Sequence, residues 1–218
     1  MAAFTLYGAR GSTNTDRVRL TLAEGGFKDY EFVLLDLAKG QQKSPDHFKR
    51  HPWGKVPAIE FSNGFTLYES RAICKYLSKK YNFPLLPSKS DIEGTALFEQ
   101  AQSVEMQYFA EPAGRIAFER FAKKFIGLPP NEQVVTDALK AVEAFFNVAE
   151  KLLSNRDYMV GDKFTLVDIY YVPLVQRLFV YPVAKVAKAW LENWFMQYHE
   201  MSLDNHGKSP KIIVLIRY

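Results

Sequence analysis

The most constraining feature of the sequence is a strand–turn–strand–helix pattern in the first third of the chain. Two short apolar runs, 58–61 and 65–68, flank Asn63-Gly64, a pair that tolerates positive φ and favours a tight β-hairpin. Glu69 and Ser70 follow at a helix start. The expected helix has a buried face made of Ala72, Ile73, Tyr76 and Leu77. Its free amides and positive dipole end favour binding of a carboxylate.

The residues before the hairpin complete a small α/β domain. We expect strands at 3–7 and 30–35, a helix at 16–24 after a loop of small and hydroxyl residues, and a helical segment at 45–50. The order is therefore β-α-β-α-β-β-α. Its first half predicts a right-handed parallel crossover and its second half an antiparallel hairpin, which together give one mixed four-stranded sheet.

A proline-marked break separates this domain from a helical one. We expect a first domain at 1–82, a linker at 83–92 and an all-helical domain at 93–218, in which 201–218 is an atypical, β-prone tail.

Within the helical domain, three features stand out. We expect one long or broken helix from 91 to 125, perturbed at Pro112 and Gly114, and a last helix at 186–199. Thr165 and Asp168 have the spacing of a capping box, a structural signal that starts a helix.

Composition excludes several functional classes. The net charge is +4, but Lys and Arg are scattered, so we expect no nucleic-acid partner. One cysteine rules out an internal disulfide and a Cys-rich zinc site, and we expect no bound metal. We find no membrane-spanning run, no secretory signal and no Gly-x-Gly-x-x-Gly fingerprint. These observations favour a cytoplasmic protein without a membrane partner.

Several stretches of the sequence resemble the cytosolic glutathione S-transferase family, in its serine-type, phi-like branch of plants and fungi. The resemblance covers residues 1 to about 200, and it is carried by residues 12–18, 36–45, 52–58, 67–73 and 164–168. It implies an α/β plus all-α fold, with a thioredoxin-like domain of a mixed four-stranded sheet followed by the helical domain. It also implies detoxifying conjugation of glutathione to small hydrophobic electrophiles, with glutathione as co-substrate, no cofactor and a homodimer.

The resemblance assigns activation of the glutathione thiol to Ser12. Only a few per cent of an ordinary thiol is ionised to thiolate at neutral pH. A hydroxyl donor at a helix start can stabilise that thiolate. Ser12 can also serve only as a helix cap, and Thr13 and Thr15 are alternative caps or donors. Tyrosine-type relatives use a strand-end tyrosine, but their pattern aligns Leu6 rather than Tyr7, so we reject Tyr7.

The resemblance also implies a glutathione-binding set drawn from three segments. The Val56 backbone, before a cis Pro57, pairs with the cysteinyl residue of glutathione. Glu69 takes the γ-glutamyl ammonium, and Ser70 takes the γ-glutamyl carboxylate. The glycyl carboxylate is expected to meet Gln42, Lys43 and Lys55. At Lys55 the family pattern usually has Gln, and an added cation near a carboxylate is favourable.

The remaining assignments are more distant from the chemistry. Trp53 matches an aromatic that anchors the partner subunit in several classes, and it can equally pack within its own domain. Cys74 falls among apolar helix residues, so we expect an inert core thiol and no disulfide exchange. The expected pocket for the second substrate is lined by Arg10, Met106, Phe109, Ala113 and Ile116. Arg10 favours polar or anionic acceptors.

A non-enzymatic function is the alternative interpretation of the same sequence. The same fold can serve as a non-catalytic carrier of glutathione or hydrophobic ligands, or as an assembly module. Ser12, Glu69 and Ser70 argue against the assembly module, since such a domain needs no glutathione site.

Overall fold

The computed structural model describes residues 2–180. They form two compact units, the first ending at Leu86 and the second starting at Pro87, a division inside the expected linker 83–92. The expected helix at 186–199 and the tail at 201–218 lie outside the described residues. No helix in the described part of the chain has both the length and the apolar character needed to cross a membrane.

The first unit contains the expected mixed sheet. Its elements are β1 (Thr5–Gly8), α1 (Thr13–Glu24), β2 (Glu31–Leu34), η1 (Gln41–Lys43), α2 (Pro45–Arg50), β3 (Ala58–Glu60), β4 (Thr66–Tyr68) and α3 (Ser70–Lys80). The strand order is β2-β1-β3-β4. β1 pairs parallel with β2 and antiparallel with β3, and β3 pairs antiparallel with β4. The predicted β-α-β-α-β-β-α order and the thioredoxin-like topology are confirmed.

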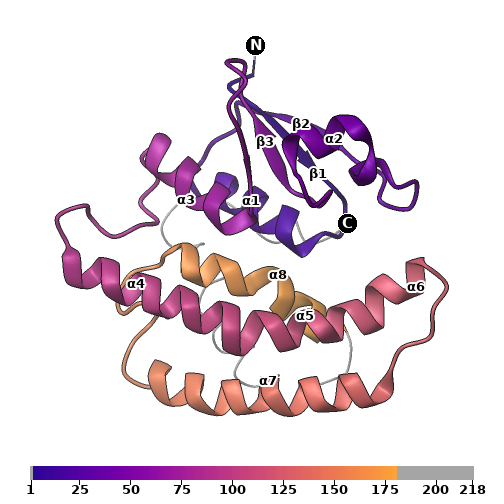
Figure 1. The fold of residues 1–218 in the computed structure, drawn as a ribbon. Coiled ribbons are helices and arrows are strands. Elements are labelled where there is room, and N and C mark those ends of the chain that lie inside the picture. The colour runs from indigo at the N-terminus through magenta and orange to yellow at the C-terminus, as the bar shows by residue number, and fades with distance from the viewer. Residues whose placement is uncertain (1, 181–218) are drawn as a thin grey trace. The chain divides into compact units, whose positions relative to one another are not determined.

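Alternation along β1 gives the sheet two different faces. Leu6 is fully buried, as are Val18 of α1 and Ile73 of α3, and these two helices pack together. The next residue, Tyr7, points the other way, where the guanidinium of Arg50 on α2 lies 4.2 Å from the centre of its ring. Figure 1 shows α1 and α3 on one side of the sheet and α2 on the other.

The hairpin between β3 and β4 is present, but its turn differs from the tight Asn-Gly turn expected. Gly64 has a φ of 82°, whereas Asn63 does not adopt a positive φ. The Gly64 amide donates to the Phe61 carbonyl at 2.9 Å, and the Asn63 Oδ1 accepts from the Phe65 amide at 3.1 Å. Glycine therefore supplies the only left-handed residue in this turn, and asparagine acts through its side chain.

The second unit begins with one continuous helical stretch. Its parts are α4 (Ile92–Val104), η2 (Glu105–Ala110), α5 (Glu111–Ala117), η3 (Phe118–Ala122) and α6 (Lys123–Phe125), and the η2 and η3 parts are π-helical. Pro112 has no N–H for the usual bond to residue 108, and the π-helical turn lies directly before it. The helix expected at 91–125 is thus unbroken.

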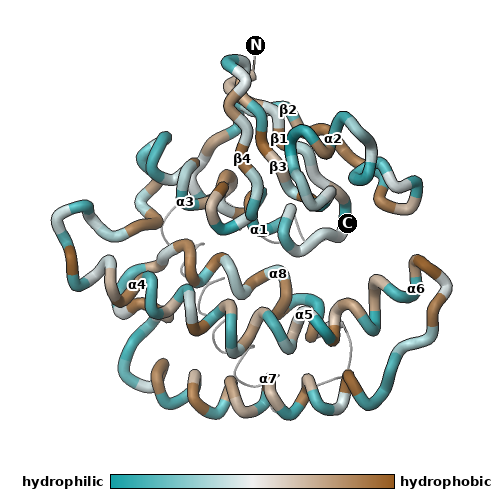
Figure 2. Tube along the Cα trace, in the orientation of Figure 1, coloured by the Kyte–Doolittle hydropathy of each residue, from teal (hydrophilic) through white to brown (hydrophobic). Residues whose placement is uncertain are grey.

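Helices α7 (Glu132–Leu153) and α8 (Leu166–Val180) complete the described part of this unit. α5 packs against both of them, and α7 runs antiparallel to the long helix (Figure 1). Hydrophobic and hydrophilic segments alternate along α7 in Figure 2 because one of its faces is buried. Phe145, Phe146 and Ala149 belong to that face.

The predicted capping box at the start of α8 is confirmed. Thr165 Oγ1 accepts from the Val167 amide at 3.3 Å, and Asp168 Oδ2 accepts from the Thr165 amide at 2.8 Å. The other carboxylate oxygen of Asp168 accepts from the Met159 amide at 3.0 Å. Burial raises the pKa of Asp168 to about 6, although these hydrogen bonds favour the ionised form.

Candidate active site

Strand register brings four separate loops to one edge of the sheet. Gly8 pairs with Leu34, Tyr7 with Ala58, and Ala58 with Tyr68. The chain therefore leaves β1, β2 and β4, and enters β3, at the same edge. The loops at this edge are 9–12, 35–44, 51–57 and 69. Every residue of the first unit that we predicted to contact glutathione lies in these loops or in the helical turns that adjoin them.

Ser12 caps the helix at this edge. α1 begins at Thr13, earlier than the predicted residue 16, and the Ser12 Oγ accepts from the Thr15 amide at 3.3 Å. A hydroxyl that accepts one hydrogen bond still has its own proton to donate. Ser12 is half-buried and stands at the positive end of the α1 dipole. Capping and donation to a ligand are thus compatible in this one side chain.

The neighbouring hydroxyl residues differ in accessibility. Thr15 is buried, and its Oγ1 accepts from the Ala9 amide at 3.2 Å. Its role is to hold the loop after β1. Thr13 is partly exposed at the first helical position. Ser12 and Thr13 therefore remain the two candidate donors.

The Tyr7 side chain lies on the face of the sheet that carries α2, opposite to the face that carries α1. Its hydroxyl donates to Glu60 Oε2 at 2.9 Å, and Arg50 Nε donates to the same oxygen at 2.7 Å. Burial and then the hydrogen bond to Glu60 raise the pKa of Tyr7, although Arg50 opposes this. A hydroxyl with a raised pKa is poorly suited to stabilise a thiolate by proton donation. This geometry supports the rejection of Tyr7.

Glu69 and Ser70 form the start of α3. Glu69 is exposed and has φ 69° and ψ 109°, an unfavourable region for a residue other than glycine. Such outliers are concentrated at functional sites. Ser70 is only 5% exposed, and its Oγ accepts from Arg17 Nη1 at 2.9 Å. Sequence reasoning missed Arg17, whose only signal is a charge on the buried face of α1.

The loop before β3 carries Val56 and Pro57, whose peptide bond is cis as the resemblance implied. Within the described residues, the Val56 amide and carbonyl have no hydrogen-bond partner, so the backbone is available to a ligand. His47 of α2 is 2% exposed, and its Nε2 lies 2.7 Å from the carbonyl oxygen of Lys55. His47 was also missed, because nothing in the sequence indicates its burial.

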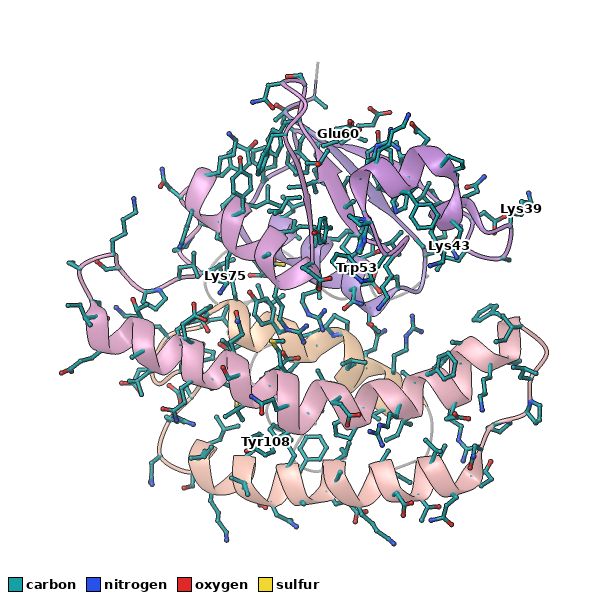
Figure 3. The ribbon with its side chains drawn as sticks, in the orientation of Figure 1. Lys39, Lys43, Trp53, Glu60, Lys75 and Tyr108 are labelled. Carbon is teal, nitrogen blue, oxygen red and sulfur yellow. The ribbon has the colours of Figure 1, made fainter. Side chains whose placement is uncertain are left out.

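The turn η1 packs against the same loop. Gly54 has a φ of 57°, and a Cβ atom at Gly54 would lie 2.8 Å from the Gln42 carbonyl oxygen. Lys43 Nζ donates to the Trp53 carbonyl at 2.9 Å. Gln42, Lys43 and Lys55 are thus close in the fold, and both lysines are exposed. In Figure 3, Lys43 and Trp53 lie on the side of the first unit away from Glu60.

Trp53 packs partly within its own unit and is partly free. Its ring centre lies 5.6 Å from that of Tyr68 and 6.3 Å from that of His51, and the Trp53 and His51 rings are nearly perpendicular. The residue nonetheless remains 61% exposed. Both readings of Trp53 therefore have structural support.

Cys74 is the core residue expected. It is fully buried, and its Sγ contacts the Arg17 carbonyl at 3.7 Å. Burial raises the pKa of its thiol to about 11. Among residues 2–180, no group of three or more His, Cys, Asp or Glu side chains is arranged to hold a metal ion.

The residues predicted to line the second-substrate pocket differ in exposure. Arg10 is exposed and Met106 is 46% exposed. Phe109 is fully buried, with its ring centre 5.2 Å from that of Phe145 and 4.9 Å from that of Tyr171. The buried members of the predicted lining are Phe109, Ala113 and Ile116.

These three buried residues belong to the core of the helical unit, since α5 packs on α7 and α8. The prediction grouped them with Met106 on one regular helix face. The π-helical turn at 105–110 changes that periodicity, because its hydrogen bonds run from i to i+5.

Comparison with known proteins identifies the family. The glutathione S-transferase N-terminal domain matches residues 2–79, and the glutathione S-transferase C-terminal domain matches residues 102–197. The chain therefore belongs to the glutathione S-transferase family, and the expected enzyme class, glutathione transferase, is confirmed at that level.

Relatives and solved structures confirm the phi-like class. The chain is 40% identical over 176 residues to glutathione S-transferase PM239X14 of Arabidopsis thaliana, covering 79% of this chain and 80% of the relative. It is 39% identical to glutathione S-transferase hmp2 of Hypomyces subiculosus, covering 79% and 81%. Maize glutathione S-transferase I, in complex with an atrazine–glutathione conjugate, superposes with a TM-score of 0.85, 31% identity and 99% coverage of both chains.

Proposed function

We propose that this protein conjugates the thiolate of glutathione to small hydrophobic electrophiles, and that the Ser12 hydroxyl stabilises the thiolate. The observation that carries this proposal is the geometry of Ser12, which accepts from the Thr15 amide and keeps its proton for a ligand. The maize relative, whose structure contains a glutathione conjugate of atrazine, supports the reaction class.

The required effect is modest in energy. Lowering the pKa of a thiol by about two units needs about 2.7 kcal/mol of preferential stabilisation of the thiolate. One charge-assisted hydrogen bond together with the positive end of α1 can supply that amount. The hydrogen bond that Ser12 accepts from Thr15 also polarises its hydroxyl and strengthens it as a donor.

The other loops of this edge would hold the peptide. The exposed Glu69 carboxylate would bind the γ-glutamyl ammonium, and Ser70 with the start of α3 its carboxylate. The free amide and carbonyl of Val56 would pair with the cysteinyl residue as an added strand does. The glycyl carboxylate would contact the cluster of Gln42, Lys43 and Lys55.

Ser12→Ala and Thr13→Ala together test the assignment of the donor. With an aryl chloride as electrophile, thiolate attack expels chloride. We expect Ser12→Ala to slow conjugation about tenfold or more while glutathione still binds, because one donor to the developing thiolate is lost. Thr13→Ala is the matched control and should keep most of the activity. The reverse result would assign the role to Thr13, and binding without turnover in the wild type would favour a non-catalytic carrier.

We further propose a cytoplasmic homodimer anchored by Trp53. The observation behind the anchor is an aromatic side chain that is 61% exposed beside a packed cluster. Sedimentation of the wild type and of Trp53→Ala tests this proposal. A dimer that dissociates in the variant is expected, and equal behaviour of the two proteins would remove Trp53 from the interface.

A further inference from the structure

A buried charged side chain in the first unit has no role in the function proposed above. Arg17 is 1% exposed and is among the largest fully buried side chains. Its Nη1 donates to Asn14 Oδ1 at 2.5 Å and to Ser70 Oγ at 2.9 Å. The guanidinium therefore connects the first turn of α1 with the first residue of α3.

Burying a guanidinium is costly, and its hydrogen bonds only partly offset that cost. A hydrophobic side chain of similar volume would tie the two helices together at least as well. An arginine at this position thus suggests a task that needs positive charge or directed donors.

The direction of the hydrogen bonds indicates what that task is. A guanidinium only donates, so the Ser70 oxygen is the acceptor from Arg17. Among the described residues, the only acceptor for the Ser70 proton is then Asn14 Oδ1, at a long distance of 3.5 Å. An anion beside Ser70 could therefore readily accept a hydrogen bond from this hydroxyl. The positive end of α3 begins at the same residue.

We propose that Arg17 is a positioning residue for the γ-glutamyl carboxylate of glutathione. It orients the Ser70 hydroxyl so that the proton is available to the carboxylate, and it places a buried positive charge behind that hydroxyl. This inference rests on the proposed function, because it assigns a determinant of specificity to the same glutathione site.

A purely structural Arg17 makes a different prediction. If the side chain only joins α1 to α3, its removal should weaken every ligand of this edge by the same factor. If it serves the carboxylate, the loss should depend on the carboxylate. The matched ligand is γ-aminobutyryl-cysteinyl-glycine, which is glutathione without the α-carboxylate of its γ-glutamyl residue.

The test measures the dissociation constants of both peptides by titration calorimetry. For Arg17→Gln we expect about tenfold or more weaker binding of glutathione, because a hydrogen bond supported by charge is lost. Binding of the analogue should change less than about twofold, the range of an unrelated surface substitution. Arg17→Lys should restore part of the affinity for glutathione. Arg19→Gln is the control on the same helix, since Arg19 lies over the Phe32 ring and should affect neither peptide.

Equal losses for the two peptides, or no loss for either, would overturn the proposal. If the wild type binds neither peptide, the proposed function itself fails, which is a separate outcome. Should the Arg17 variants not fold, isotope-labelled arginine in the wild type gives a second readout by NMR. The Arg17 guanidinium signals should shift with glutathione and stay in place with the analogue. Signals that respond equally to both would again refute the assignment.

Discussion

His47 Nε2 and the carbonyl oxygen of Lys55 lie 2.7 Å apart, and this contact holds the loop that presents Val56. The histidine is buried on α2, while the loop it holds leads into the edge of the sheet. A helix outside the predicted glutathione-binding set thus fixes the backbone on which the proposed peptide contact depends.

Replacing His47 with leucine should weaken glutathione binding. The variant keeps a buried apolar body but loses the contact to the Lys55 carbonyl, so the Val56 backbone is less well ordered. We expect the KM for glutathione to rise about threefold to tenfold, the range for loss of one hydrogen bond. Steady-state kinetics at varied glutathione concentration measures this.

The matched variant is His47→Gln, whose side-chain amide can donate to the same carbonyl. It should recover most of the affinity. A His47→Leu protein with unchanged KM would show that the loop is held by other contacts.

Ser12→Gly separates helix capping from thiolate stabilisation. Glycine is nearly as good a cap as serine, so the free energy of unfolding should fall by only a few tenths of a kcal/mol. The hydroxyl is nevertheless lost, and conjugation should slow about as much as in Ser12→Ala, about tenfold or more. Chemical denaturation and initial rates on the same preparation check both parts. Full activity in this variant would mean that the hydroxyl does not contact the thiolate.

Tyr7→Phe should leave conjugation almost intact. The Tyr7 hydroxyl donates to Glu60 on the face of the sheet that carries α2, so its removal costs a partly exposed hydrogen bond. We expect a loss of about 1 kcal/mol in unfolding free energy and a change in rate below about twofold. A large loss of rate with normal stability would contradict the geometry that excludes Tyr7.

Cys74 should resist thiol reagents in the folded protein. The side chain is fully buried, and its thiol pKa of about 11 leaves almost no thiolate at neutral pH. Labelling with a chromogenic disulfide is expected to be slow in buffer and to reach one equivalent rapidly only in denaturant. Rapid labelling in buffer would place the thiol at the surface.

Asp168 should make stability depend on pH in a specific direction. Its pKa in the folded protein is about 6, above the ordinary 3.8, so the folded state binds the proton more tightly. This contribution is fully present below about pH 3.8 and is lost as the pH rises through about 6. The difference corresponds to up to about 3 kcal/mol.

The comparison protein for this measurement is Asp168→Asn, which does not titrate. The unfolding free energy of the wild type should fall relative to that of Asp168→Asn between about pH 4 and pH 7. Denaturant titrations across this range give the difference directly. A difference that rises with pH would show that the hydrogen bonds from Met159 and Thr165 outweigh the effect of burial.

Local patterns predicted much of the fold. The apolar runs around Asn63-Gly64 gave the hairpin, and the hydroxyl and carboxylate spacing of Thr165 and Asp168 gave the start of α8. α1 begins at Thr13 rather than at the predicted residue 16, because adjacent hydroxyl residues can each cap a helix. In the structure Ser12 is the cap of this helix, because the Thr15 hydroxyl points inward and accepts from the Ala9 amide.

What the sequence could not provide depends on tertiary context. The π-helical turn before Pro112 shifts the face on which Phe109 falls, and no propensity scale signals such a shift. The burial of His47 and Arg17 is set by loops and helices distant in sequence. The residues proposed to contact glutathione were therefore easier to predict from the sequence than the residues that hold them in place.

The backbone of Glu69 has a consequence for engineering. Its φ of 69° is a conformation that glycine adopts at little cost and that other residues adopt at about 1–3 kcal/mol. A library screened only for heat resistance would thus enrich glycine at this position, because glycine relieves the backbone strain and the screen does not select for the carboxylate. If the Glu69 carboxylate binds the γ-glutamyl ammonium as proposed, a library screened for turnover would retain glutamate. At position 69, selection for stability and selection for activity would thus favour different residues.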